Sequence, residues 1–363
     1  MPNTAIWKRA VLSLPVLWLL APAIQPKAAP TPALEKVIQA AKEEREMKMV
    51  LGGWGPQQLW DDIAALTKKI YGVDIRVSFG SGPNLSRATA RGLQEYAAGQ
   101  PSSTDAFLNS PRLAFSLTEK GVAEKVNWRE LKPDLPASVI NDASTGLIVA
   151  GTTGGIVYNK NMMRAEDLPA TVEDLLDPKY KGKIVSTSTA SQWSEIAVLK
   201  GEKLVTRVIE GIVKNGNLVG VEPGCGDKDL IAAGQYAMQA FYCVMYEAQN
   251  YADQTGAPIG LAFLKDAKWV APYHWVVPKN GKSRNVAVLV GLVLATPEAQ
   301  KILDKWQGRT SPYIPGGRIY TLTQEGQKSG KDFMIDTWDV IEKHKGLYIG
   351  KIRREWQKML SGR

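Results

Sequence analysis

The 363-residue sequence has few of the side chains that catalytic and metal sites require. Its two histidines, His274 and His344, stand far apart, whereas a zinc hydrolase needs histidines at helical spacing plus a carboxylate. No G-x-S-x-G elbow of a serine hydrolase is present, and the phosphate-loop pattern ahead of NGKS fails at Val276. FGSGPN is too short for a dinucleotide fingerprint. These absences weigh against an enzyme and predict no cofactor.

The apolar run near the N-terminus is too short to cross a membrane. A basic pair precedes an apolar core at residues 10–20, and Ala21-Pro22-Ala23 gives a small-x-small cleavage pattern. The pattern predicts a signal peptide at 1–23, a spacer rich in proline and alanine at 24–33, and a periplasmic mature protein. No cysteine near the cleavage site offers a lipid anchor, so no membrane anchor is expected; the rival interpretation is an uncleaved apolar anchor.

Cysteine is equally scarce, with only Cys225 and Cys243 in the chain. In an oxidising compartment the pair can form a disulfide, worth about 3 kcal/mol for a loop of this size in the chain-entropy model. The alternative is two buried free thiols that act as small apolar residues. Export favours the disulfide, and spacing alone leaves both interpretations open.

Acidic residues are outnumbered by basic ones, giving a formal net charge of +9. Removing residues 1–23 takes away two basic residues and no acid, so the mature charge is 9 − 2 = +7. The excess is spread along the chain rather than gathered in runs, which argues against a nucleic-acid partner. A field of this sign favours anionic small ligands or an anionic surface.

Apolar periodicity predicts an α/β protein of two lobes. A helix opens at Thr31-Pro32, with an apolar face at positions 34, 37, 38 and 41. Strands at MKMVLGG, VDIRVSFG and DAFLNS then alternate with helical patterns, and the alternation continues through the middle of the chain. Such alternation predicts mainly parallel sheets flanked by helices.

Polar loops follow four successive strands of this pattern, at GGWGPQ, FGSGPN, LNSP and STSTASQ. Ligands of open α/β sheets bind beyond the carboxyl ends of the strands, and loops at helix N-termini offer N–H groups to oxyanions. For any single loop the plainer interpretation is a turn with a helix cap. Their recurrence predicts a binding cleft lined by Trp54, Ser81, Asn84, Asn109, Ser110, Ser188, Thr189 and Gln192.

The segment AFYCVMYEAQNY adds clustered phenols to this inventory. Strand alternation sends Tyr242 and Tyr246 to one face and Cys243 to the other. The two tyrosines would then form a wall of the cleft. His274, in the strand WVAPYHWVVP, either faces the same cleft or packs in the core.

The chain resembles the periplasmic solute-binding proteins of ABC importers, of the type II fold, in the branch that includes the ferric-iron binders. The landmarks DAFLNS, GGIVYNKNMM, DLLDPKYKGKI, STSTASQ, TGAPIG and LATPEAQKIL fall in that family's order across almost the whole mature chain. The resemblance implies two lobes joined by a hinge: 34–155 and 261–363, with the C-terminal helices, for the first, and 156–260 for the second. It also implies a monomer that captures a small solute and delivers it to a membrane permease.

The iron binders' residues are only partly matched in this sequence. Ser188 and Thr189 stand where the family places anion-holding hydroxyls, whereas Tyr246 is followed by Glu247 in place of a second tyrosine. Ferric iron wants several anionic oxygens, so we expect no metal and a small organic or oxyanionic solute. The alternatives are a ferric-iron protein with a synergistic anion, using Tyr246 and Glu247, an exported enzyme using Tyr242, Glu247 or His274 in proton transfer, and a sensory module.

Overall fold

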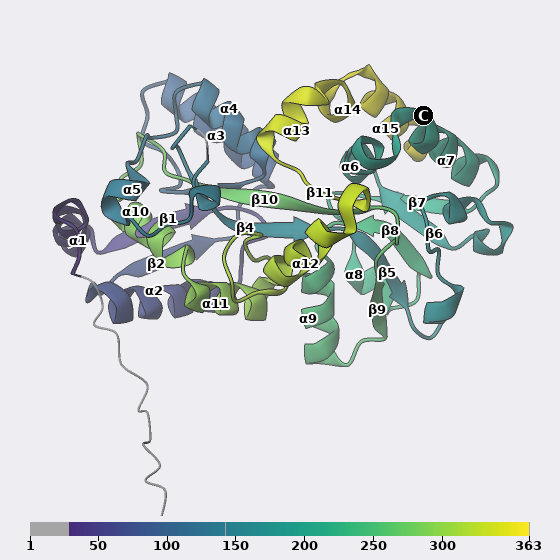
Figure 1. The fold of residues 1–363 in the computed structure, drawn as a ribbon, viewed down its shortest axis with the longest axis horizontal. Coiled ribbons are helices and arrows are strands. Elements are labelled where there is room, and N and C mark those ends of the chain that lie inside the picture. The colour runs from purple at the N-terminus through teal and green to yellow at the C-terminus, as the bar shows by residue number, and fades with distance from the viewer. Residues whose placement is uncertain (1–28, 142, 363) are drawn as a thin grey trace, which may run out of the picture.

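The computed structural model describes residues 29–141 and 143–362, which form two α/β lobes side by side (Figure 1). The predicted two-lobed α/β architecture is confirmed. The predicted signal peptide at 1–23 and the first half of the predicted spacer lie outside the described residues.

The first lobe contains two sheets. Its strands are β1 (Glu46–Val50), β2 (Arg76–Gly80), β3 (Phe107–Asn109), β4 (Leu147–Thr153), β10 (Lys268–Val276) and β11 (Phe333–Ile335). Its helices are α1 (Pro32–Glu44), α2 (Gln57–Tyr71), α3 (Leu85–Ala97), α4 (Pro111–Glu119), α5 (Trp128–Leu131), α10 (Arg284–Leu294), α11 (Pro297–Gln307), α12 (Arg318–Gly326) and α13 (Trp338–Lys343). β1 and β2 pair in parallel, while β10 pairs with β11 in parallel and with β3 and β4 antiparallel.

The second lobe is built on one five-stranded sheet in the order β7-β6-β8-β5-β9. Its strands are β5 (Gly155–Asn159), β6 (Ile184–Thr187), β7 (Leu218–Glu222), β8 (Met238–Tyr242) and β9 (Ile259–Ala262). Its helices are α6 (Ser191–Lys200), α7 (Glu202–Lys214), α8 (Lys228–Ala232) and α9 (Met245–Thr255), to which α14 (Lys345–Ile349) and α15 (Lys351–Ser361) are added from the C-terminus.

The sheets are mixed, so the prediction of mainly parallel strands is wrong. β6 runs parallel to β7 and β8, but β5 runs antiparallel to β8 and β9, as β4 does to β10. The chain enters the second lobe along β4 and β5 and returns along β9 and β10. Because these outgoing and returning strands lie next to each other, they must run in opposite directions.

Local signals explain the first helix. Thr31 caps α1, since its Oγ1 accepts a hydrogen bond from the Leu34 N–H at 3.1 Å, and Pro32 supplies the fixed φ suited to a first turn. Leu34, Val37, Ile38 and Ala41 are buried, as the period of 3.6 residues predicts.

The most apolar helix, α10, lies in the core of the first lobe. Residues 286–294 are all buried, and the Trp275 Nε1 donates to the Ala287 carbonyl at 2.9 Å. Within the described ranges no single helix is long and apolar enough to span a membrane; α10 and α11 satisfy that test only as a pair bent by 88°.

The chain crosses between the lobes at a point of close backbone approach. β4 continues into β5 through Gly154, where a Cβ would lie 2.2 Å from Cζ2 of Trp269, at the start of β10. Only glycine fits there, because any side chain would collide with this ring.

A further crossing brings the C-terminal helices to the second lobe. After β11 the chain forms α13 against α4, and then α14 against α6. Trp356 and Leu360 of α15 are buried in the same core as Ile184 and Val208 of the second lobe. The sequence interpretation grouped residues 261–363 with the first lobe; the structure instead packs the end of that segment on the second lobe, because the apolar face of α15 is buried against α7.

Candidate functional site

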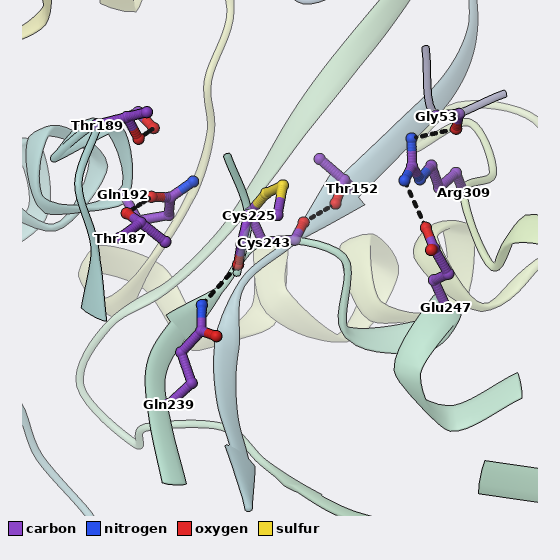
Figure 2. Close-up of a disulfide and its surroundings, with 11 residues drawn as sticks. Gly53, Thr152, Thr187, Thr189, Gln192, Cys225, Gln239, Cys243, Glu247 and Arg309 are labelled. Carbon is purple, nitrogen blue, oxygen red and sulfur yellow. Dashed lines mark hydrogen bonds and ion pairs between the residues drawn. A yellow bond between two sulfur atoms is a disulfide. The ribbon is translucent and has the colours of Figure 1, made fainter. Parts of the chain in front are cut away.

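An ion pair joins the two lobes. Arg309, just after the end of α11, pairs with Glu247 in the first turn of α9, and its Nη1 donates to the Gly53 carbonyl at 2.9 Å (Figure 2). Only 12% of the Arg309 side chain and 27% of the Glu247 side chain are exposed. Since one residue belongs to each lobe, the contact depends on how close the lobes lie.

Aromatic rings surround the Arg309 guanidinium. Its carbon lies 5.1 Å from the ring centroid of Trp54, which makes an edge contact with Tyr273 at 5.5 Å. Burial raises the pKa of Tyr273, and Arg309 opposes the shift. Burial also raises the pKa of Tyr242, with Glu247 adding to it. Both phenols are therefore neutral at physiological pH.

Two hydrogen-bond donors beside the ion pair are unsatisfied. The buried Nε1 of Trp54 and Nε of Arg309 have no hydrogen-bond partner among the described residues. Leaving a buried donor unpaired costs about 1–3 kcal/mol. Neither nitrogen can accept a hydrogen bond, so a group that binds to either must bring a hydrogen-bond acceptor. A carboxylate, phosphate or sulfate has that character.

The junction of β8 and α9 differs from the sequence interpretation. β8 ends at Tyr242, after Phe241 with φ +60°, and Tyr246 lies in α9. The predicted shared strand face of Tyr242 and Tyr246 is therefore wrong. Tyr246 packs under the guanidinium of Arg318, 4.7 Å from its ring centroid, and makes an edge contact with Phe263.

A disulfide holds this junction to the loop after β7. Cys225 and Cys243 are bridged, with Cα atoms 5.2 Å apart (Figure 2). The Gln239 Nε2 donates to the Cys225 carbonyl at 2.6 Å, and the Thr152 Oγ1 of β4 donates to the Cys243 carbonyl. Both sides of the bridge are thus fixed beside the crossing strands.

The predicted anion-holding loop at the start of α6 is occupied by internal contacts. The Ser188 N–H donates to the Glu222 carbonyl at 2.9 Å, and Gln192 Oε1 accepts from the Thr187 hydroxyl at 2.8 Å. The carbonyl of Thr189 accepts hydrogen bonds from Arg353 and Gln357, both on α15. The C-terminal helix therefore packs directly against this loop.

The remaining predicted loop residues make contacts inside the first lobe. Ser81 and Asn84 are exposed, and the Asn84 Oδ1 caps α3 by accepting from the backbone at 3.0 Å. Asn109 is buried and donates to Thr89 Oγ1 at 3.0 Å, while Ser110 is the half-buried N-cap residue of α4. His274 lines a different cavity, described below, so the predicted residues divide among several places.

Two carboxyl groups are buried where the C-terminal segment meets the second lobe. Burial raises the pKa of Asp336 to about 7, and the Tyr348 hydroxyl donates to its Oδ1 at 2.6 Å. Burial also raises the pKa of Glu195 on α6, and the neighbouring Asp336 adds to that shift. Protonation of these carboxyl groups lowers the cost of burying two acids next to each other, away from water.

Residues 103–344, two thirds of the chain, match the family model of bacterial extracellular solute-binding proteins. The chain belongs to this family. The similar solved structures include the substrate-binding protein of an ABC transporter from Agrobacterium tumefaciens, 18% identical, with 92% of this chain and 98% of that chain covered and a TM-score of 0.66. An ABC transporter substrate-binding protein from Bradyrhizobium japonicum is 13% identical, with 87% of this chain and 99% of that chain covered and a TM-score of 0.67. Iron-bound HitA from Pseudomonas aeruginosa is 15% identical, with 86% of this chain and 99% of that chain covered and a TM-score of 0.64. At these identities the structures show a shared fold.

The predicted class, an extracytoplasmic solute-binding protein, is thereby confirmed, and its family is one of binders rather than enzymes. Sequence reasoning missed Arg309, whose ion pair with Glu247 joins the lobes of this solute-binding protein. It stands in the segment QGRTSPYIPGGR, which has neither strand nor helix periodicity, and its partner Glu247 is 62 positions away. No local signal could have paired the two.

Within residues 29–141 and 143–362 no three His, Cys, Asp or Glu side chains are grouped as metal ligands would be. Glu247, named as a ligand in the iron alternative, is held by Arg309, and Tyr246 is covered by Arg318. A cation on Glu247 would have to displace the Arg309 guanidinium, and one at Tyr246 would lie beside the positive charge of Arg318.

Proposed function

We propose that this solute-binding protein captures a small anionic solute between its lobes, with Arg309 and Trp54 as the principal donors. The observation that supports this most directly is the pair of buried, unsatisfied donors beside an arginine that already reaches across to the second lobe. A carboxylate or other oxyanion can accept from the free Nε of the guanidinium in a charge-assisted hydrogen bond, and from the indole N–H as well. Tyr242 and Tyr273 add neutral phenols at the same place.

The proposed role is delivery of this solute to the permease of an ABC importer. Binding between lobes stabilises the arrangement in which they are close, and a membrane partner can distinguish that arrangement from the open one. The proposal places the protein in the periplasm as a monomer, without membrane anchor, nucleic-acid partner, cofactor or catalytic role. Genes for a permease and an ATPase beside its own would support delivery over a purely sensory role.

A thermal-shift screen of the purified mature chain tests the solute class. Small carboxylates, phosphate and sulfate are compared with amines and with ferric citrate. Stabilisation by one group of anions is expected, amounting to about 2.7 kcal/mol at a hundredfold excess over Kd. The variant Arg309→Met should lose this response, whereas Arg284→Met, at an arginine paired within the first lobe, should keep it.

Two results would contradict the proposal. One is stabilisation by amines alone. The other is an intense visible band on addition of ferric iron that disappears in Tyr246→Phe, which would establish a tyrosinate–iron site instead.

A further inference from the structure

A cavity lies between α4 and α13, apart from the ion pair of Arg309 and Glu247. Its volume is about 320 Å³, at the small end of the ~300–1,000 Å³ usual for small-molecule pockets. Its walls come from α4, from the segment after α5 (Ala137, Ser138, Ile140, Asn141 and Ala143), from β4 and β10, and from α13 with its cap. Trp54, Glu247 and Arg309 are not among its lining residues. Two neighbouring residues of β10 therefore lie at different sites: Tyr273 lies beside the ion pair, and His274 lines this cavity.

The cavity walls are largely apolar and aromatic. Phe115 of α4 and Trp338 of α13 stack with ring planes 12° apart, which joins the two helices at this wall. Apolar cavities of about 150 Å³ already accept a benzene ring, so this one has room for a substituted ring. The main apolar contributors are Phe115, Ile140, Ile148, Pro272, Tyr313 and Trp338.

His274 is the polar group in this lining with unused hydrogen-bonding capacity at both nitrogens. It is 6% exposed, and neither Nδ1 nor Nε2 has a hydrogen-bond partner among the described residues. The half-buried polar groups of the wall are engaged: Thr118 bonds to Thr145, Asn141 accepts from backbone N–H groups, and Thr337 caps α13. A ligand group is the natural partner for the imidazole.

The charges of the lining favour a neutral ligand. Burial lowers the pKa of His274 to about 4, so the ring is uncharged near pH 7 and offers one donor and one acceptor. Among the described residues of the lining there is no Lys or Arg, and the acid that they include, Asp339, is exposed. An anion would enter without a counter-charge, which is costly in an apolar cavity. A hydroxyl group both donates and accepts, and so matches a neutral imidazole.

We propose that this cavity binds a phenol, a small neutral aromatic molecule that bears a hydroxyl group. Its hydroxyl bonds to His274, and its ring packs against the stacked pair of Phe115 and Trp338 on one side and the aliphatic walls on the other. Because α13 forms one wall and continues into α14 and α15 on the second lobe, the bound molecule also favours this position of the C-terminal segment. The site is distinct from that of the transported solute and does not depend on its identity.

The two histidines of the chain allow a direct test by NMR. The mature protein is labelled with 15N at histidine, and the His274 signals are assigned by their retention in His344→Gln, which also serves as the control variant. Titration with phenol should shift the His274 imidazole signals saturably and leave those of His344 unmoved. Toluene, of similar shape but without the hydroxyl, should bind about tenfold more weakly, and benzoate should give no shift.

Two variants locate the site. His274→Phe should abolish the preference for phenol over toluene, measured by thermal shift, while His344→Gln keeps it. Trp338→Ala should weaken the phenol-induced shift of His274 by removing one wall. Unmoved His274 signals in the unmodified chain at millimolar phenol, or equal shifts with benzoate, would overturn the proposal whether or not the variants fold.

Discussion

Replacing Arg309 by methionine removes the charge that links the lobes while keeping a side chain of similar length. The change leaves the Glu247 carboxylate and the Gly53 carbonyl without their donor. Breaking one side of a buried pair costs about 3–5 kcal/mol. Because 27% of the Glu247 side chain remains exposed, the lower end applies, and we expect a loss of about 3 kcal/mol in the free energy of unfolding.

Urea unfolding, followed by both tryptophan fluorescence and circular dichroism, measures this loss. Coincident transitions show that one free energy describes the chain. Arg284→Met is the matched control, because Arg284 pairs with Glu124 inside the first lobe and its side chain is 41% exposed. It should cost about 1 kcal/mol or less. In small-angle scattering Arg309→Met should give a larger radius of gyration than Arg284→Met, because it removes one of the contacts between the lobes and Arg284→Met removes none.

A double-mutant cycle with Glu247→Gln separates the ion pair from the other contacts of Arg309. We expect a coupling of about 1–3 kcal/mol, as for residues in direct contact. A coupling below about 0.5 kcal/mol, or a loss no larger than that of Arg284→Met, would refute the claim that this pair holds the lobes together.

The other predictions concern the disulfide, the crossing and the buried acids. Reducing the bridge between Cys225 and Cys243 should lower the free energy of unfolding by about 3 kcal/mol, read from the urea midpoint with and without reductant. Gly154→Ala should cost about 1–3 kcal/mol in the same assay, because its Cβ would collide with an indole ring of β10, whereas Gly346→Ala, with open space around it, should be neutral or slightly stabilising. The raised pKa of Asp336 means that the folded chain binds more protons than the unfolded chain between about pH 4 and about pH 7, so stability should fall as the pH rises through that window. In thermal melts, the stability of Asp336→Asn should fall less with rising pH than that of the unmodified chain. The same fall in both would show that Asp336 does not titrate in this window.

The two-lobed fold and the protein class could be predicted because both depend on patterns that repeat along the chain. The apolar face of α1 follows a period of 3.6 residues, and alternating strands and helices require layered packing. Strand direction depends on which strands become neighbours, and β9 meets β5 only after three intervening strands and four α-helices. That information lies in tertiary contacts rather than in any local segment.

The site was less predictable for a related reason. Residues such as Asn84 and Gln192 have the polar character of ligand contacts, yet they satisfy caps and internal hydrogen bonds. The apolar run AFYCVM has strand propensity throughout, but the positive φ of Phe241 ends the strand and moves Tyr246 onto a helix. Arg309 gains its role from Glu247, a partner in the other lobe, and charge pairs of this kind leave no periodic trace.

The position of α15 has a consequence for the order of assembly. Trp356 and Leu360 complete a core that begins at Ile156, so the second lobe closes around residues far downstream of its own strands. Synthesis proceeds from the N-terminus, and domains generally fold as units once their chain is complete. Without α15, the apolar surface of the second lobe that Trp356 and Leu360 cover is open to solvent. Residues 155–262 therefore cannot complete their core as an isolated fragment, and the second lobe becomes a folding unit only together with a segment that first passes through the other lobe.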